Sequence, residues 1–169
     1  MPQGILLHQG ENGYTYLKKI FQSMHDFQKD YNWLITDCEA YPENPKHAAR
    51  LYQSRHGGYT WMSGGELTRL IYEDDFQWIW AVLSGFAPTC SMEDVLKYPL
   101  PCIRNADSDW NKAYGIQHPL ASVELSAWDS SYTIFFSHNK SLIQRFQQSF
   151  PLGENLTKQT DSGAGSHGI

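Results

Sequence analysis

The chain has 169 residues and a formal net charge of −5; 41% of the residues are hydrophobic and only 18% are charged. This length suits one domain with a substantial buried core, and the composition argues against global disorder. Lysine and arginine form no long basic run, which argues against nucleic acid or an anionic membrane surface as the partner. No apolar run approaches the ~20 residues of a membrane span, and the three cysteines match no metal or redox spacing. We therefore expect a cytoplasmic protein with reduced thiols.

The first half of the chain alternates between strand and helix patterns. Apolar periodicity and turn residues predict the boundaries of these elements. In chain order, we expect a short edge strand at residues 4–9, a helix at 14–27, a strand at 31–41, a mostly loop segment at 42–58, a strand at 59–62, and a helix opened by a Ser63–Glu66 capping box.

The second half continues in the same way and then loses its apolar residues. We expect a strand at 76–83, a short helix opened by Ser91 and Asp94, an irregular segment at 101–119, a hairpin that turns at 128–131, and a helix at 139–151. The polar, glycine-rich residues 153–169 are expected to be a disordered tail, because they hold too little apolar surface to offset the entropy of ordering.

The order of these elements predicts an α+β fold. Strands that follow one another without a helix between them pair antiparallel. We therefore expect one mostly antiparallel sheet of about five or six strands, with helices mainly on one face, in a single domain over residues 1–152.

The stretch "EDDFQWIWAVLSGF" decides which strand is central. Both sides of residues 76–83 are apolar when their side chains alternate, as is typical of a strand covered on both faces. Trp78 is accordingly predicted to be part of the core, whereas Glu73, Asp74 and Asp75 are predicted to form a solvated turn.

Catalytic candidates are few. Asp37 and Glu39 alternate onto one face of a predicted strand, where two carboxylates could carry out acid–base chemistry, although a solvated strand end explains them as well. Three cysteines and seven histidines could supply a Cys–His pair only if distant residues met in space. No histidine or cysteine spacing indicates a metal site, and we expect no cofactor.

Two segments are candidates for partner binding. The acidic turn of Glu73, Asp74 and Asp75 carries the densest run of like charge in the chain. The loop around residues 50–59 instead groups arginine with tyrosine, residue types that are enriched at protein interfaces. Its candidate residues are Arg50, Tyr52, Arg55 and Tyr59.

Several segments together resemble small cytoplasmic bacterial proteins of uncharacterised function, a class that includes many immunity proteins. They are "YNWLITDCEAYP", "WMSGGEL", "FQWIWAVLSGF", "VELSAWDSSYTIFFS" and the C-terminal helix, and they cover most of residues 1–152. The resemblance implies a compact acidic domain without a catalytic constellation, which neutralises a cognate toxin by a tight protein–protein contact.

Two alternatives remain beside this non-catalytic binding module. One is a small hydrolase-type enzyme that uses Asp37 and Glu39 or a Cys–His pair. The other is a structural or adaptor subunit, which only the oligomeric state and the partners would separate from a binding module.

Overall fold

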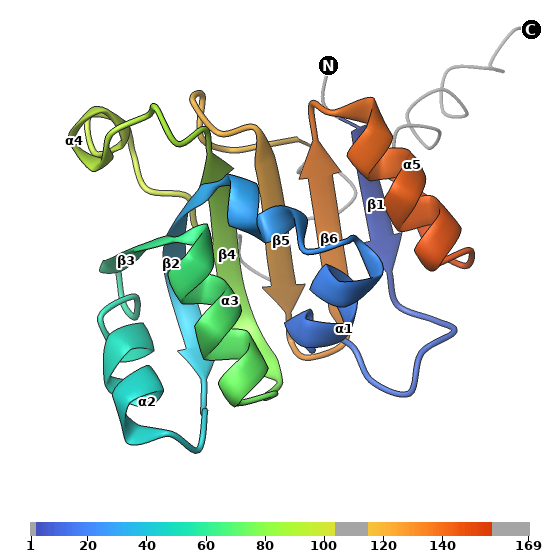
Figure 1. The fold of residues 1–169 in the computed structure, drawn as a ribbon, viewed down its shortest axis with the longest axis horizontal. Coiled ribbons are helices and arrows are strands. Elements are labelled where there is room, and N and C mark those ends of the chain that lie inside the picture. The colour runs from blue at the N-terminus through green and yellow to red at the C-terminus, as the bar shows by residue number, and fades with distance from the viewer. Residues whose placement is uncertain (1–2, 104–114, 157–169) are drawn as a thin grey trace, which may run out of the picture.

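The protein is an α+β domain built on one antiparallel sheet, as expected. A computed structural model describes residues 3–103 and 115–156. In these residues the sheet has seven strands rather than the expected five or six, in the order β3-β2-β4-β5-β6-β1-β7, and every pairing is antiparallel. Figure 1 shows the strands side by side, with α1, α3 and α5 in front of them.

The predicted elements occur in the predicted order, and the structure adds α2 and β7 to them. The strands are β1 (Gln3–Leu7), β2 (Asn32–Ala40), β3 (Tyr59–Ser63), β4 (Trp78–Phe86), β5 (Val123–Trp128), β6 (Tyr132–Ser137) and β7 (Glu154–Asn155). The helices are α1 (Leu17–Ser23), α2 (Pro45–Tyr52), α3 (Gly64–Glu73), α4 (Met92–Val95) and α5 (Lys140–Ser149), with a 3-10 turn, η1, at Phe27–Asp30.

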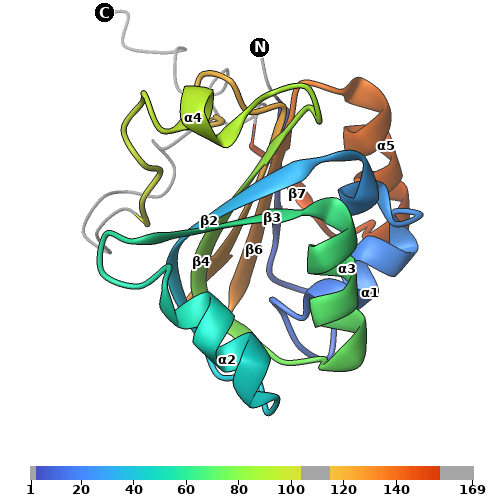
Figure 2. The same ribbon diagram turned by 60° about the vertical axis from the view of Figure 1, so that its left-hand side comes forward.

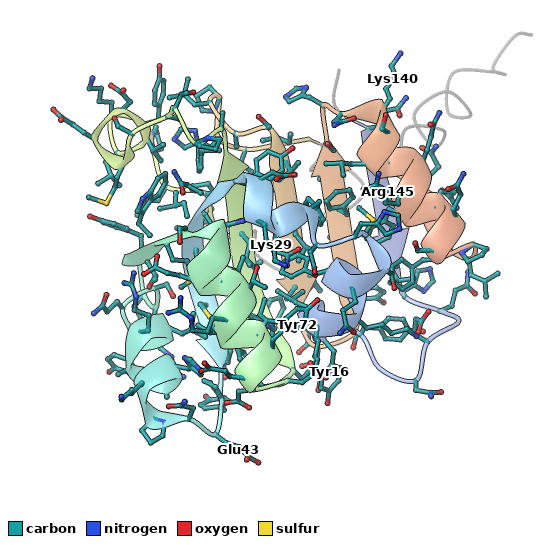
Figure 3. The ribbon with its side chains drawn as sticks, viewed as in Figure 1. Tyr16, Lys29, Glu43, Tyr72, Lys140 and Arg145 are labelled. Atoms are coloured by element: carbon teal, nitrogen blue, oxygen red, sulfur yellow. The ribbon has the colours of Figure 1, made fainter. Side chains whose placement is uncertain are left out.

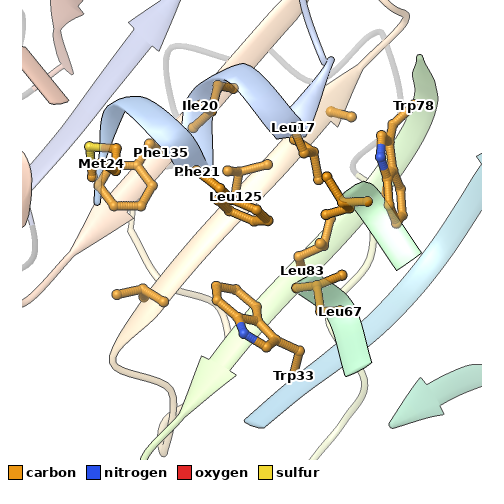
Figure 4. Close-up of a cluster of buried hydrophobic side chains, with 14 of the residues drawn as sticks. Leu17, Ile20, Phe21, Met24, Trp33, Leu67, Trp78, Leu83, Leu125 and Phe135 are labelled. Carbon is orange, nitrogen blue, oxygen red and sulfur yellow. The ribbon is translucent and has the colours of Figure 1, made fainter. Parts of the chain in front are cut away.

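The larger core lies between the sheet and helices α1, α3 and α5. Figure 2 shows these three helices together on one side of the sheet. Arg145 of α5, labelled in Figure 3, donates a hydrogen bond to the carbonyl oxygen of Met24, 3.3 Å away, and so ties α5 to the end of α1. Side chains such as Phe21, Trp33 and Leu125 fill the space between the layers (Figure 4).

A smaller core covers one end of the opposite face. It consists of Leu34, Phe86, Val95 and Ala121, so α4 packs on the other side of the sheet from α1, α3 and α5. His118 is buried beside it, where Nε2 lies 2.9 Å from the Val95 carbonyl oxygen and Nδ1 accepts the Leu120 N–H.

The prediction that residues 76–83 form a covered, central strand is confirmed. Strand β4 lies between β2 and β5, and Trp78 is 1% exposed in the larger core. Val82 and Phe86 are fully buried as well. The strand is covered on both sides from Ala81 to Phe86, whereas Ile79 and Trp80 are half-buried.

The seventh strand lies in the segment that we expected to be a tail. Glu154 and Asn155 pair with Leu6 and Ile5, so packed structure continues past residue 152, and β1 is no longer an edge strand. These two polar residues carry no strand pattern, and they join the sheet by pairing with the backbone of β1. Residues 157–169 of the expected tail lie outside the described residues.

Helix α2 occupies a segment that we expected to be mostly loop. Asn44 caps the helix, because its side chain accepts a hydrogen bond from the Lys46 N–H. Pro45 occupies the first turn, where the missing N–H of proline costs no hydrogen bond within the helix. Leu51 is its buried residue, so the apolar stripe on which helix prediction depends is almost absent. In residues 3–103 and 115–156, no helix is long and apolar enough to cross a bilayer.

Candidate functional site

Two irregularities in the β2–β4 pairing shape the candidate site. The register shifts between Thr36 and Glu39 and again between Glu39 and Ala40, opposite Trp80 and Trp78. Asp37 lies in the first shift with a positive φ of 46°, a conformation that Asp and Asn tolerate better than most residues. Such bulges redirect side chains at the edges of binding sites.

A pocket of about 410 Å³ opens at these bulges. It is lined by Asp37, Cys38, Glu39, Tyr41, Arg55, His56, Trp80 and Ile103. The prediction that Asp37 and Glu39 share one side of the strand holds, and the intervening Cys38 packs into the larger core.

Hydrogen bonds hold both carboxylates of the pocket. One oxygen of Asp37 accepts the backbone N–H of Ile103 at 2.7 Å. One oxygen of Glu39 accepts the Tyr41 hydroxyl at 3.0 Å. Each carboxylate retains a second oxygen for a ligand, since a carboxylate offers about four lone-pair sites.

An aromatic stack borders the pocket on the side of the 50–59 loop. The guanidinium carbon of Arg55 lies 5.2 Å from the ring centre of Tyr41 and 5.2 Å from that of Tyr52. The two tyrosines are 62% and 66% exposed. We call Tyr41, Arg55 and Tyr52 the tyrosine–arginine stack.

The thiol nearest to the pocket is unsuited to nucleophilic chemistry. Burial raises the pKa of Cys38 to about 12, although the hydrogen bond with Ser54 and the charge of Arg55 act in the opposite direction. The thiolate is the reactive form, so Cys38 is inert near neutral pH. Burial also raises the pKa of Cys90.

No metal centre accompanies the pocket in the described part of the chain. Within residues 3–103 and 115–156, no group of three or more His, Cys, Asp or Glu side chains is placed to hold a metal ion. The pocket therefore offers two carboxylates, one guanidinium and an aromatic wall, which suit binding and charge recognition.

The acidic turn is partly used inside the molecule. Glu73 lies 3.0 Å from His47 Nε2, and Asp74 accepts the backbone N–H of Asn44 at 3.0 Å. Both partners belong to α2 or to its N-terminal cap, so these carboxylates hold α2 in place. Asp75 is exposed.

The loop candidates separate into two groups. Tyr52 and Arg55 form part of the stack, whereas Arg50 donates to the Trp61 carbonyl oxygen at 2.6 Å and fixes α2 to β3. Tyr59 packs against the smaller core. Only the first group presents side chains that are not already engaged in packing or in holding an element.

Helix α2 connects the two predicted surfaces. The acidic turn contacts its N-terminal end, and the stack follows from its C-terminal end. A helix of eight residues is roughly 12 Å long. Both surfaces therefore fit within one interface of standard size, which buries about 800 Å² on each partner.

Sequence reasoning missed three residues of the site. Tyr41 could have been found, since Asp37, Glu39 and Tyr41 continue one alternating side of the predicted strand. Trp80 and Ile103 could not, because they reach the pocket from β4 and from a distant segment.

Comparison with known proteins adds no relative. No protein family, no curated protein and no solved structure matches this chain.

Proposed function

We propose that the protein is a non-catalytic module that binds another protein, and specifically a cytoplasmic immunity protein that neutralises a bacterial toxin. The tyrosine–arginine stack carries the proposal. Arginine and tyrosine dominate binding energy at interfaces, and rigid aromatic side chains lose little entropy on binding. Two tyrosine rings that each contact Arg55 and are 62% and 66% exposed present such residues in a preorganised form.

The acidic turn supports the same proposal by a different physical effect. A toxin that acts on nucleic acid has a basic cleft, and exposed acidic residues accelerate association with a basic partner. Glu73 and Asp74 also hold α2, so Asp75 is the residue of the turn where steering can be tested without disturbing the fold.

The alternative of a hydrolase rests on the shared pocket of Asp37 and Glu39. Two carboxylates on one pocket wall could supply an acid and a base. A hydrolase that uses a Cys–His pair has no support at Cys38, because its thiol is protonated near neutral pH. Turnover of model esters, glycosides or phosphoesters that is lost in Glu39→Gln would favour the hydrolase over the binding module.

The decisive experiment begins by identifying the partner. The tagged full chain is isolated from its own host, co-purifying proteins are identified, and the purified toxin is titrated with wild-type protein. Arg55→Ala and Tyr52→Ala should each weaken binding by about 2 kcal/mol or more, roughly thirtyfold in Kd, because stacked Arg and Tyr are typical hot spots.

The matched control is Lys140→Ala, which removes one positive charge from an exposed side chain at the start of α5. It should bind like the wild type, and protection of cells that express the toxin should follow the same order. The proposal is wrong if no toxin-like protein co-purifies, or if the partner binds the Arg55 and Tyr52 variants with unchanged affinity.

A further inference from the structure

The pocket beside the tyrosine–arginine stack has the size of a site for one ligand group. Its volume of about 410 Å³ lies within the ~300–1,000 Å³ of typical ligand pockets. It opens where β2 and β4 are both irregular, so its shape comes from the sheet itself.

The charge of the pocket is negative. Among the described lining residues, two carboxylates, Asp37 and Glu39, stand against one guanidinium, that of Arg55, which gives a net charge of −1 when His56 is neutral. Among the described residues, no lysine or arginine nitrogen lies within 4.0 Å of either carboxylate. The two carboxylates are thus held by Ile103 and Tyr41, and no described lysine or arginine forms an ion pair with them.

The apolar wall of the pocket favours a cation with an aliphatic stem. Trp80 and Ile103 line it, and the Trp80 ring is held by an edge contact with Trp128 at 5.3 Å between ring centres. Tryptophan is the best aromatic partner for a cation, and Lys and Arg pack their methylene stems on apolar surfaces.

We infer that this pocket receives a basic side chain, arginine or lysine, from the bound partner. The cationic head lies between the carboxylates of Asp37 and Glu39, and the stem packs on Trp80 and Ile103. The biological meaning of the inference rests on the proposed function, whereas the preference of the pocket for a cation can be measured without any partner.

An acidic side chain that binds Arg55 is the competing occupant. The guanidinium of Arg55 already lies 5.2 Å from the ring centres of Tyr41 and Tyr52, and an anion inside the pocket would meet two carboxylates. Like charges brought together without water are strongly unfavourable. The pocket therefore selects for positive charge.

The test uses three capped amino acids and the full chain. N-acetyl-arginine amide is compared with N-acetyl-citrulline amide, which has nearly the same shape but no charge, and with N-acetyl-glutamate amide. Binding is followed by two-dimensional NMR, with the indole N–H of Trp80 assigned through a Trp80→Phe spectrum. We expect the arginine probe to bind in the millimolar range and the other two to bind at least about fivefold more weakly.

Two isosteric variants locate the binding site. Asp37→Asn retains a residue that tolerates the positive φ, and Glu39→Gln retains the shape of the side chain. Each should weaken the arginine probe about fivefold and reduce its salt dependence. Glu43→Gln removes the same charge from a side chain that projects away from the body of the molecule (Figure 3), and it should change nothing. Near-UV circular dichroism verifies that all three variants are folded.

Each failure has a distinct meaning. The inference is overturned if citrulline binds as well as arginine, if the glutamate probe binds more tightly, or if no probe perturbs the pocket. In those cases the proposed function still stands if the Arg55→Ala variant binds the toxin more weakly than the wild type does. Conversely, if the arginine probe binds but no toxin partner is found, the inference about the pocket is supported and the proposed immunity function is wrong.

Discussion

Asp26 connects the N-terminal segment to α3 through a single carboxylate. Its backbone has a positive φ of 54°, and the carboxylate accepts hydrogen bonds from Tyr72, Gln28 and Lys29. Burial by itself raises the pKa of Asp26, but these hydrogen bonds together outweigh burial, so the pKa lies below the ordinary value of 3.8. The ionised form therefore stabilises the fold.

Asp26→Asn should lower the melting temperature in a pH-dependent manner. A folded-state pKa below the unfolded value gives stability that is present above about pH 4 and is lost as the pH falls through the folded pKa. The difference between wild type and variant should thus be largest near neutral pH and should shrink as the pH falls below about 4. Thermal unfolding across this range measures it, with exposed Asp30→Asn as the control. A difference that does not vary with pH would show that the carboxylate contributes no charge-dependent stability.

The start of α3 shows how an element is placed by its neighbours. The Ser63–Glu66 capping box closes the helix terminus with hydrogen bonds of 3.1 Å and 2.7 Å. Gly64 lies so close to η1 that an added Cβ would be 2.2 Å from the Gln28 carbonyl oxygen. At Gly65 the nearest atom to such a Cβ is Ser63 Oγ at 3.8 Å.

Alanine substitutions at these adjacent glycines should have opposite effects. Gly64→Ala should cost about 1–3 kcal/mol, because backbone atoms of η1 must move. Gly65→Ala should stabilise by about 0.5–1 kcal/mol, since it removes backbone freedom from the unfolded chain without a clash. Urea denaturation of both variants measures the two values. Equal effects would mean that α3 is not pressed against η1.

At the scale of the whole molecule, the C-terminal segment adds an edge strand, β7, to the sheet. After α5 the chain returns to β1, where Glu154 pairs with Leu6 and contacts His8 at 2.7 Å. Gln147 of α5 donates to the Gly153 carbonyl oxygen at 2.9 Å. These contacts join the first and last described strands, although the sequence predicts a disordered tail from residue 153.

Two truncated chains measure how much β7 contributes to the free energy of unfolding. A chain that ends at Leu152 should be less stable by about 1–2 kcal/mol than a chain that ends at Leu156, because a few hydrogen bonds of about 1 kcal/mol each are lost. Comparing the two isolates residues 153–156, and chemical denaturation provides the values. If the two chains unfold at the same denaturant concentration, β7 contributes nothing and the expected boundary at 152 describes the stable domain better.

Local patterns in the sequence determined most elements and their burial. The capping box, the hairpin turn at 128–131 and the doubly apolar stretch around Trp78 depend on residues a few positions apart, so their physics is contained in short windows. The same reasoning placed Asp37 and Glu39 on one side of a strand and selected Tyr52 and Arg55 as candidates for partner binding.

Only the tertiary structure decided what these residues form together. The strand order, the paired bulges and β7 depend on which backbones meet, and contacts between distant segments leave little trace in local periodicity. Trp80, Ile103 and Arg55 thus come to surround the two carboxylates as one pocket, because β2, β4 and the segment after α2 converge there. The sequence therefore determined the chemistry of the side chains, and the pairing of distant strands determined which of them could act on one ligand.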